Sequence, residues 1–216
     1  DSRGGPPSPA QVEGRSLAKG PSGRTEPHSR KVLQMKTALP VLLAVLTLST
    51  AATADLTDAR RAEQQELLAW VETLRYQART DQALSVCEMI LASDPECVDA
   101  LIEHGVMTLA DGHFEEAQED FRGALKLEPK HPMALVGRGH VHHATGDVER
   151  SQEDASKALE QCNRAIAAER ADAQTYYVRG LAKMLLEDPA ALQDFVMAIS
   201  LDPGHMDAHT ERAHVY

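Results

Sequence analysis

The sequence predicts an all-α fold, an α-solenoid in which antiparallel helical hairpins stack one on the next. Aromatic residues make up 4% of the 216 residues and alanine is abundant, a composition that suits closely packed helices better than sheets. Related residues also recur 34 residues apart along the chain. Glycine and proline fall at regular points between the apolar positions, where hairpins turn and helices end.

The 34-residue period is carried by leucine, glycine, alanine and proline, and such a period is typical of repeat proteins. It relates Leu67, Leu101 and Leu135; Gly105 and Gly139; Gly112 and Gly146; Ala83 and Ala117; and Pro95 and Pro129. Within a repeat, a 4-3-5 spacing places small and larger apolar residues on one helical face. This spacing occurs in Ala83-Cys87-Ile90-Pro95, Ala117-Phe121-Ala124-Pro129, Ala158-Cys162-Ala165-Arg170 and Ala191-Phe195-Ala198-Pro203.

Each repeat is therefore predicted to fold as two antiparallel helices. Gly105 and Gly139 would let the first helix approach the second closely, because they carry no Cβ atom. Gly112 and Gly146 lie where the hairpin is expected to turn. The acid-proline pairs expected to end the second helices are Asp94-Pro95, Glu128-Pro129 and Asp202-Pro203.

These features resemble the tetratricopeptide repeat, and the clearest unit is VDALIEHGVMTLADGHFEEAQEDFRGALKLEP at residues 98–129. His104 and Thr108 depart from the leucine and the aromatic residue of the family pattern. The resemblance covers about residues 58–216 and implies a right-handed superhelix. Its units would span about 64–97, 98–131, 132–171 and 172–205, with a partial unit at 206–216. It also implies a protein–protein interaction scaffold rather than an enzyme.

The third unit carries seven extra residues. Twelve residues separate Gly146 from Ala158, whereas five separate Gly112 from Ala117. The extra residues continue the 4-3 series of small residues, so the second helix is predicted to be longer by two turns, or about 10 Å. The longer helix would either contact a partner or be a tolerated heptad insertion.

The first 54 residues are predicted to lie outside the repeat domain, which would be residues 55–216. Residues 1–34 are rich in Pro, Gly, Ser and Arg with no apolar period, and we expect disorder there. Residues 35–54 have the layout of a signal peptide: Met35-Lys36, an apolar run over 38–48, and Ala52-Thr53-Ala54 before the cut. Cleavage after Ala54 would place the protein in the periplasm or outside the cell. A eukaryotic secretory lumen, or a membrane anchor formed by an uncleaved segment 38–54, is the alternative.

The charge of the chain argues against a nucleic-acid partner. The net charge is −11, and it is unevenly distributed. Residues 1–54 hold seven of the 22 Lys and Arg residues but three of the 33 Asp and Glu residues, which leaves −15 for residues 55–216. So large an acidic surplus would repel a phosphate backbone.

No motif in the sequence indicates catalysis, a cofactor or a small-molecule substrate. A Gly-rich phosphate loop, a nucleophile elbow and a His-Glu-x-x-His zinc helix are all missing from it. His140 and His143 would lie one helical turn apart and could share a metal ion with His104 or a residue of a neighbouring helix. A metal-binding function of this histidine cluster is therefore the alternative, as is a membrane-tethered assembly factor.

Three cysteines bear on the compartment and the core. Cys87 and Cys162 fall at the position of Phe121 in the 4-3-5 spacing, so we expect them to be packed in the core. Cys97 lies beyond a helix end and is predicted to be exposed. An odd number of cysteines would leave at least one thiol unpaired in an oxidising compartment.

The resemblance also places a partner-binding groove, because the first helices of successive tetratricopeptide units line a concave surface. The positions that it assigns to this groove are Asp99, Ile102, Val106, Leu109, Met133, Val136, His140, His143, Gln174, Tyr177, Leu181 and Met184. Ile102 and Val106 stand where a clamp for a terminal carboxylate would need polar residues. The groove is therefore predicted to be apolar with an acidic rim, and to bind a peptide or helix of a cell-envelope protein unless a C-terminal helix fills it. Arg138 and Arg179 are expected to brace the stack instead.

Overall fold

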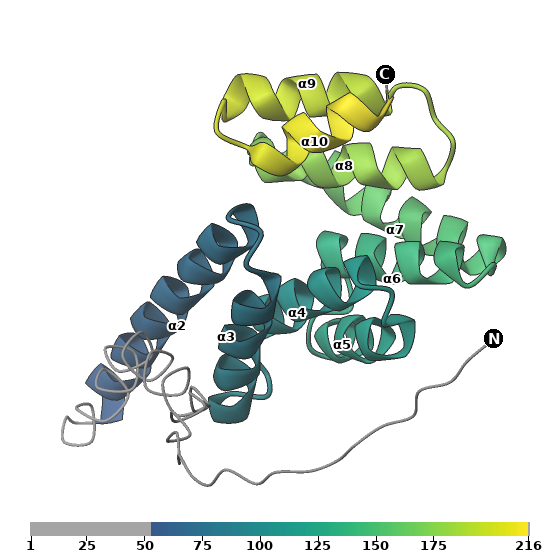
Figure 1. The fold of residues 1–216 in the computed structure, drawn as a ribbon. Coiled ribbons are helices and arrows are strands. Elements are labelled where there is room, and N and C mark those ends of the chain that lie inside the picture. Colours follow the sequence, from purple (N-terminus) through teal and green to yellow (C-terminus); the bar gives the residue numbers. More distant parts are fainter. Residues whose placement is uncertain (1–52, 216) are drawn as a thin grey trace, which may run out of the picture. The chain divides into compact units, whose positions relative to one another are not determined.

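The computed structural model describes residues 53–215, and these residues form nine helices and no strand (Figure 1). The chain divides into two compact units, Asp1–Leu56 and Thr57–Tyr216, and the helical hairpins lie in the second. Residues 1–52, which include the predicted upstream segment and nearly all of the predicted signal peptide, lie outside the described residues. The helices are α2 (Thr53–Tyr76), α3 (Thr80–Ser93), α4 (Val98–Ala110), α5 (Phe114–Leu127), α6 (Pro132–Ala144), α7 (Val148–Ala167), α8 (Ala173–Leu185), α9 (Ala191–Leu201) and α10 (Met206–Val215).

The helices pack as a series of antiparallel hairpins, which confirms the predicted α-solenoid. The most extensive contacts join α4 to α5, α6 to α7, and α8 to α9 (Figure 1). Each hairpin also packs on the next, through α5 and α6, α7 and α8, and α9 and α10. The first helices of neighbouring hairpins touch as well, α4 against α6 and α6 against α8.

The hairpin turns and helix ends follow the predicted signals. Gly112 and Gly146 have φ angles of 81° and 85°, a left-handed conformation that glycine adopts without steric cost. The other hairpin turns keep the same conformation without glycine, at Ala78 and Glu187. The predicted acid-proline stops are also confirmed, because α3, α5 and α9 end immediately before the acidic residue of each pair.

Close contact between a phenylalanine ring and two glycines holds α5 between its neighbours. The Phe121 side chain is fully buried, and a Cβ atom built at Gly105 of α4 would lie 3.0 Å from its ring. A Cβ atom at Gly137 of α6 would lie 2.3 Å from the same ring, closer than any real contact. The ring therefore packs against backbone on both sides. In the fourth unit the same close approach occurs on one side of the ring, where a Cβ atom at Gly180 would lie 2.5 Å from Phe195.

In each hairpin from α4 to α9, a basic side chain of the first helix contacts an aspartate of the second helix. The residue that precedes the first-helix glycine donates to an aspartate of the second helix, as Arg138 does to Asp154 at 2.7 and 2.8 Å. Arg179 pairs with Asp194 in the same way, at 3.0 Å. Both aspartates are buried, so the pairing offsets the cost of removing their charge from water. The predicted bracing by arginine thus acts mainly within a hairpin.

The second unit uses histidine at the equivalent position. His104 Nδ1 lies 2.7 Å from a carboxylate oxygen of Asp120. This hydrogen bond raises the pKa of His104, although burial of the ring acts in the opposite direction. The pair is thus the one member of the series whose charge changes near neutral pH.

The predicted lengthening of the third unit is confirmed, since α7 has 20 residues and α5 has 14. The predicted register is wrong, however. Asp154 lies 16 residues after Arg138, as Asp120 lies 16 after His104, so Ala155 and not Cys162 corresponds to Phe121. A seven-residue insertion returns to nearly the same helical face, which makes both registers compatible with the sequence. The ion pair selects one of them and places the extra turns at the carboxyl end of α7.

The small side chain of Ala155 is compensated in the next hairpin. Val178 occupies the position in α8 that corresponds to Gly137 in α6, two residues before the first-helix glycine. Both Ala155 and Val178 are buried in the same core. Large Phe121 is thus matched by Gly137, whereas small Ala155 is matched by the larger Val178. Exchanging the large and the small residue in this way conserves the packed volume.

The last described helix, α10, packs on α9 as the first helix of a fifth unit would, with Ala208 fully buried. Among the helices of residues 53–215, none combines the length and the apolar character that crossing a bilayer requires. The segment 38–54, for which a membrane anchor is one alternative, lies almost entirely outside the described residues.

Replacing Gly137 with alanine should destabilise the protein, because the added methyl group would overlap the buried Phe121 ring. We expect a loss of about 1–3 kcal/mol in the free energy of unfolding, measured by urea denaturation. Gly123→Ala is the matched control: its new Cβ atom would meet Leu101 at an ordinary 3.5 Å. It should raise stability by up to about 1 kcal/mol, since alanine favours helix. Equal effects of the two variants would contradict the packing described above.

The His104–Asp120 pair should make stability depend on pH. Because the folded-state pKa of His104 is raised, its contribution is complete below the unfolded pKa of about 6.5 and is lost as pH rises through the folded value. In His104→Arg the cation persists, so the fall in unfolding free energy as pH rises above about 6.5 should be smaller than in the wild type. Identical pH slopes in urea titrations would rule out this origin.

Candidate functional site

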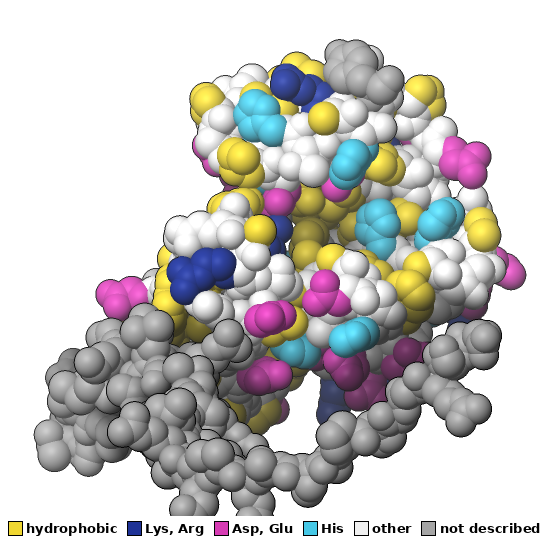
Figure 2. All heavy atoms as spheres, viewed as in Figure 1, with side chains coloured by type: hydrophobic (Ala, Val, Ile, Leu, Met, Phe, Trp, Pro, Cys, Tyr) yellow, Lys and Arg dark blue, Asp and Glu magenta, His cyan; other side chains and the backbone are white. Residues whose placement is uncertain are grey.

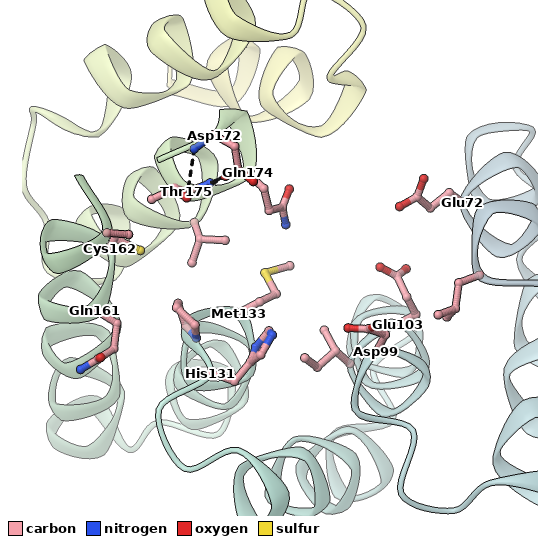
Figure 3. A pocket seen from close by; sticks show the side chains of 15 residues that line it. Glu72, Asp99, Glu103, His131, Met133, Gln161, Cys162, Asp172, Gln174 and Thr175 are labelled. Atoms are coloured by element: carbon pink, nitrogen blue, oxygen red, sulfur yellow. Dashed lines mark hydrogen bonds between the residues drawn. The ribbon is translucent and has the colours of Figure 1, made fainter. Parts of the chain in front are cut away.

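The first helices of the repeats enclose two adjoining cavities in the described part of the chain. The first has a volume of about 460 Å³ and lies between α2, α4, α6, α7 and α8 (Figure 3). The second, of about 440 Å³, extends toward the loop before α10. They share lining residues, so we treat them as one groove. The shared residues are Glu72, Glu103, Met133, Asp172 and Gln174.

The floor of the groove is apolar. Leu68, Ile102, Met133 and Val178 contribute side chains from four different helices to the first cavity. Figure 2 shows hydrophobic side chains at the bottom of the hollow. Residues one turn apart on a helix share a face, which is why each first helix presents an apolar side chain here and buries its other face in the core.

The walls of the groove are acidic. Glu72 from α2 and Asp99 and Glu103 from α4 extend toward the same space (Figure 3). Asp99 and Glu103 are four residues apart and therefore lie on one side of α4. Asp172 adds a fourth carboxylate at the start of α8, where it accepts hydrogen bonds from the Thr175 side chain and backbone. These bonds lower the pKa of Asp172 and keep it charged.

Arg75 bridges the groove between α2 and α10. Its guanidinium group donates two hydrogen bonds to the Asp207 carboxylate, at 3.0 and 2.9 Å. Its Nε atom lies 3.6 Å from Oε2 of Glu103, too far for a hydrogen bond. Both of these atoms are buried, and neither has a hydrogen-bond partner among the described residues.

The groove is an unfavourable setting for the Glu103 carboxylate. Burial raises its pKa, and Glu72 and Asp207 act in the same direction, while Arg75 acts against them. His131, which also lines the groove, has a pKa lowered by burial and is therefore largely neutral at pH 7. The negative charge of the walls is thus only partly offset by the chain itself.

The structure brings together half of the partner-binding residues predicted from the sequence. Those that line the groove are Asp99, Ile102, Val106, Met133, Gln174 and Tyr177. The other six lie elsewhere: Val136 and Leu181 are in the core, Leu109 and Met184 pack against it, His140 is half-buried and His143 is exposed. Most of these six belong to later turns of the same helices, beyond the end of the cavities.

Sequence reasoning missed most of the charged groove residues. Glu103 had a detectable signal, because it lies one turn after Asp99. Glu72 and Arg75 lie near the end of α2, and nothing in the repeat pattern marks their side of that helix. Asp207 enters through α10, which the structure brings close to α2.

The carboxyl-terminal part of α7 forms one wall of the groove. Cys162 and Ala165 of the extra turns, and Gln161 just before them, line the first cavity, whereas α3, α5 and α9 contribute no lining residue among those described. The insertion therefore contributes to the lining of the groove.

The histidine pair is not part of a larger ligand set. His140 has a pKa of about 4, lowered by burial and by the neighbouring His143. Within residues 53–215, no three His, Cys, Asp or Glu side chains gather as a metal site would require.

All three cysteines are free thiols. Cys87 and Cys162 are buried in the core as predicted, and burial raises the pKa of Cys162 to about 11. The prediction that Cys97 is exposed is wrong. It is half-buried because its side chain packs beside the core formed by α2, α3 and α4.

Comparison with known proteins agrees with this architecture. Residues 108–161, from α4 to α7, match the family model of the tetratricopeptide repeat. The probable biofilm formation methyltransferase WspC of Pseudomonas putida is 34% identical over 96 residues, covering 43% of this chain and 23% of WspC. Human DnaJ homolog subfamily C member 7 is 26% identical over 159 residues, covering 67% of this chain and 31% of that protein. The chain thus spans less than a third of either relative.

Among solved structures, the thermophilic TPR protein TTC0263 of Thermus thermophilus is 16% identical, with a TM-score of 0.48. That match covers 86% of this chain and 97% of TTC0263. PilF of Pseudomonas aeruginosa is 19% identical with a TM-score of 0.48, covering 72% of this chain and 68% of that structure.

Proposed function

We propose that this tetratricopeptide-repeat solenoid is a non-catalytic scaffold that binds a peptide or helical segment of another protein in its groove. The observation that carries the proposal is the groove itself, with an apolar floor and carboxylates contributed by α2, α4 and α8. Apolar surface that stays accessible in a folded protein commonly marks a partner site.

The lining of the groove suits a polypeptide segment. Its two cavities adjoin, and the first extends to α7 while the second extends to the loop before α10, so a ligand that fills both contacts side chains from most of the first helices. An amphipathic helix can lay its apolar face on such an apolar floor. The α10 helix lines the second cavity through Asp207. It does not fill this cavity, which has a volume of about 440 Å³.

Met133→Glu should abolish partner binding, because Met133 lines both cavities and a carboxylate there would be added to an acidic, apolar-floored site. The matched control is Met197→Glu on α9, where the side chain is 41% exposed and lies outside the groove. We expect at least about a tenfold loss of affinity for the captured partner in the first variant and none in the second.

The measurement is affinity capture with the full chain, followed by titration of the purified partner. Circular dichroism should show equal helix content in both variants. Equal retention of the partner by both variants would place its binding site elsewhere.

We further propose that the protein is exported to the periplasm of a bacterial cell, where its partner would be an envelope protein. Support comes from the layout of residues 35–54, with a basic start, an apolar run and the Ala52-Thr53-Ala54 site. Amino-terminal sequencing of the protein from the periplasmic fraction should give a first residue of Asp55. Retention in the membrane with residues 38–54 attached would favour the anchored form instead.

A further inference from the structure

The groove carries more negative charge than the chain can neutralise. Its lining includes the carboxylates Glu72, Asp99, Glu103, Asp172, Asp202 and Asp207. Arg75 is the one arginine or lysine among the described residues that line it. Its two strongest contacts go to Asp207, at the α10 end, rather than to the α4 carboxylates.

Contact between Arg75 and Glu103 is incomplete. The 3.6 Å separation leaves Nε of Arg75 and Oε2 of Glu103 buried without hydrogen bonds. A buried charged atom without a partner costs more than an exposed one, so a donor supplied from outside would be stabilised at Glu103. Glu72 and Asp99 face the same space and make no ion pair within the described part of the chain (Figure 3).

We propose that the groove recognises its partner through a lysine or arginine side chain bound by Glu72, Asp99 and Glu103, and that Arg75 competes with it from within the chain. This inference rests on the proposed function of the groove. The partner segment is an amphipathic peptide whose apolar residues lie on Ile102 and Met133, next to the basic residue.

The position of Arg75 explains how it competes. It joins α2 to α10 through Asp207 while its Nε atom remains near Glu103, so it partly screens the site that an incoming cation would occupy. Removing Arg75 should leave Glu103 more available. Removing Asp207 should do the reverse, because Arg75 would then be free to turn to Glu103.

The opposite effects expected for the Arg75 and Asp207 variants on peptide affinity distinguish competition from a structural role. If the bridge between α2 and α10 only held the groove in shape, Arg75→Gln and Asp207→Asn would change binding in the same direction. Competition predicts that the first variant binds a basic peptide more tightly and the second more weakly.

The experiment uses a phage-displayed library of random dodecapeptides selected on the full chain, followed by anisotropy titrations of synthetic peptides. Selected sequences should share a lysine or arginine beside apolar residues. Replacing that residue with norleucine, and separately Glu103→Gln, should each weaken binding about tenfold. Because both changes remove the same contact, the double change should cost little more than either alone.

Further variants complete the test. Arg75→Gln should tighten binding a few-fold, and Asp207→Asn should weaken it. Glu115→Gln, an exposed carboxylate on α5 outside the groove, is the matched control and should change nothing. The norleucine substitution is made in the peptide, so its result does not depend on how any protein variant folds.

The outcomes also distinguish this inference from the proposed function. Suppose that Met133→Glu abolishes binding of the selected peptides but that these peptides contain no basic residue, or that the norleucine and Glu103→Gln effects add. Either result would overturn the cation site and leave the proposed groove intact. If Arg75→Gln and Asp207→Asn changed the affinity for the peptide in the same direction, competition by Arg75 would be overturned. If every selected peptide still bound Met133→Glu, both the groove and the cation site would be refuted.

Discussion

In the hairpins from α4 to α9, the residue before the first-helix glycine is a cation or a histidine that meets an aspartate of the second helix. Asp154 and Asp194 are buried, and a buried carboxylate without a partner would cost several kcal/mol. This requirement fixes how far one helix can slide along the other, since the arginine reaches its aspartate in one register only. The glycine that follows then lies close to its neighbours: a Cβ atom would lie 2.5 Å from Phe195 at Gly180 and 3.0 Å from Phe121 at Gly105.

The register of the third hairpin determines one wall of the groove. Because Arg138 is paired with Asp154, the extra turns of α7 extend past the end of the normal hairpin. They carry Cys162 and Ala165 to the first cavity, next to the apolar floor. A register with Cys162 at the position of Phe121 would instead have placed the added residues at the opposite end of α7. The ion pair that anchors α7 therefore decides which residues of the insertion line the groove.

The groove concentrates like charges that the chain compensates only in part. Burial raises the pKa of Glu103, and the neighbouring carboxylates act in the same direction while Arg75 opposes them. Arg75 relieves part of the repulsion between these carboxylates and at the same time ties α2 to α10. Elsewhere acidic residues of the second helices face solvent or are paired within their hairpin. The groove is thus where like charges are held together without full compensation.

The sequence alone determined the all-α repeat architecture, the turns at Gly112 and Gly146 and the proline stops, because these depend on local conformational preference and on a period visible in the chain. It also located six groove residues, since a helix repeats its faces every turn. Only the tertiary structure decided the register of α7, because a heptad insertion preserves the apolar face and both alignments satisfy it. It likewise decided the charge of the groove. Glu72 and Arg75 of α2 lie near Asp207 of α10, although these helices are far apart in the chain, and a local sequence pattern cannot predict such a long-range contact.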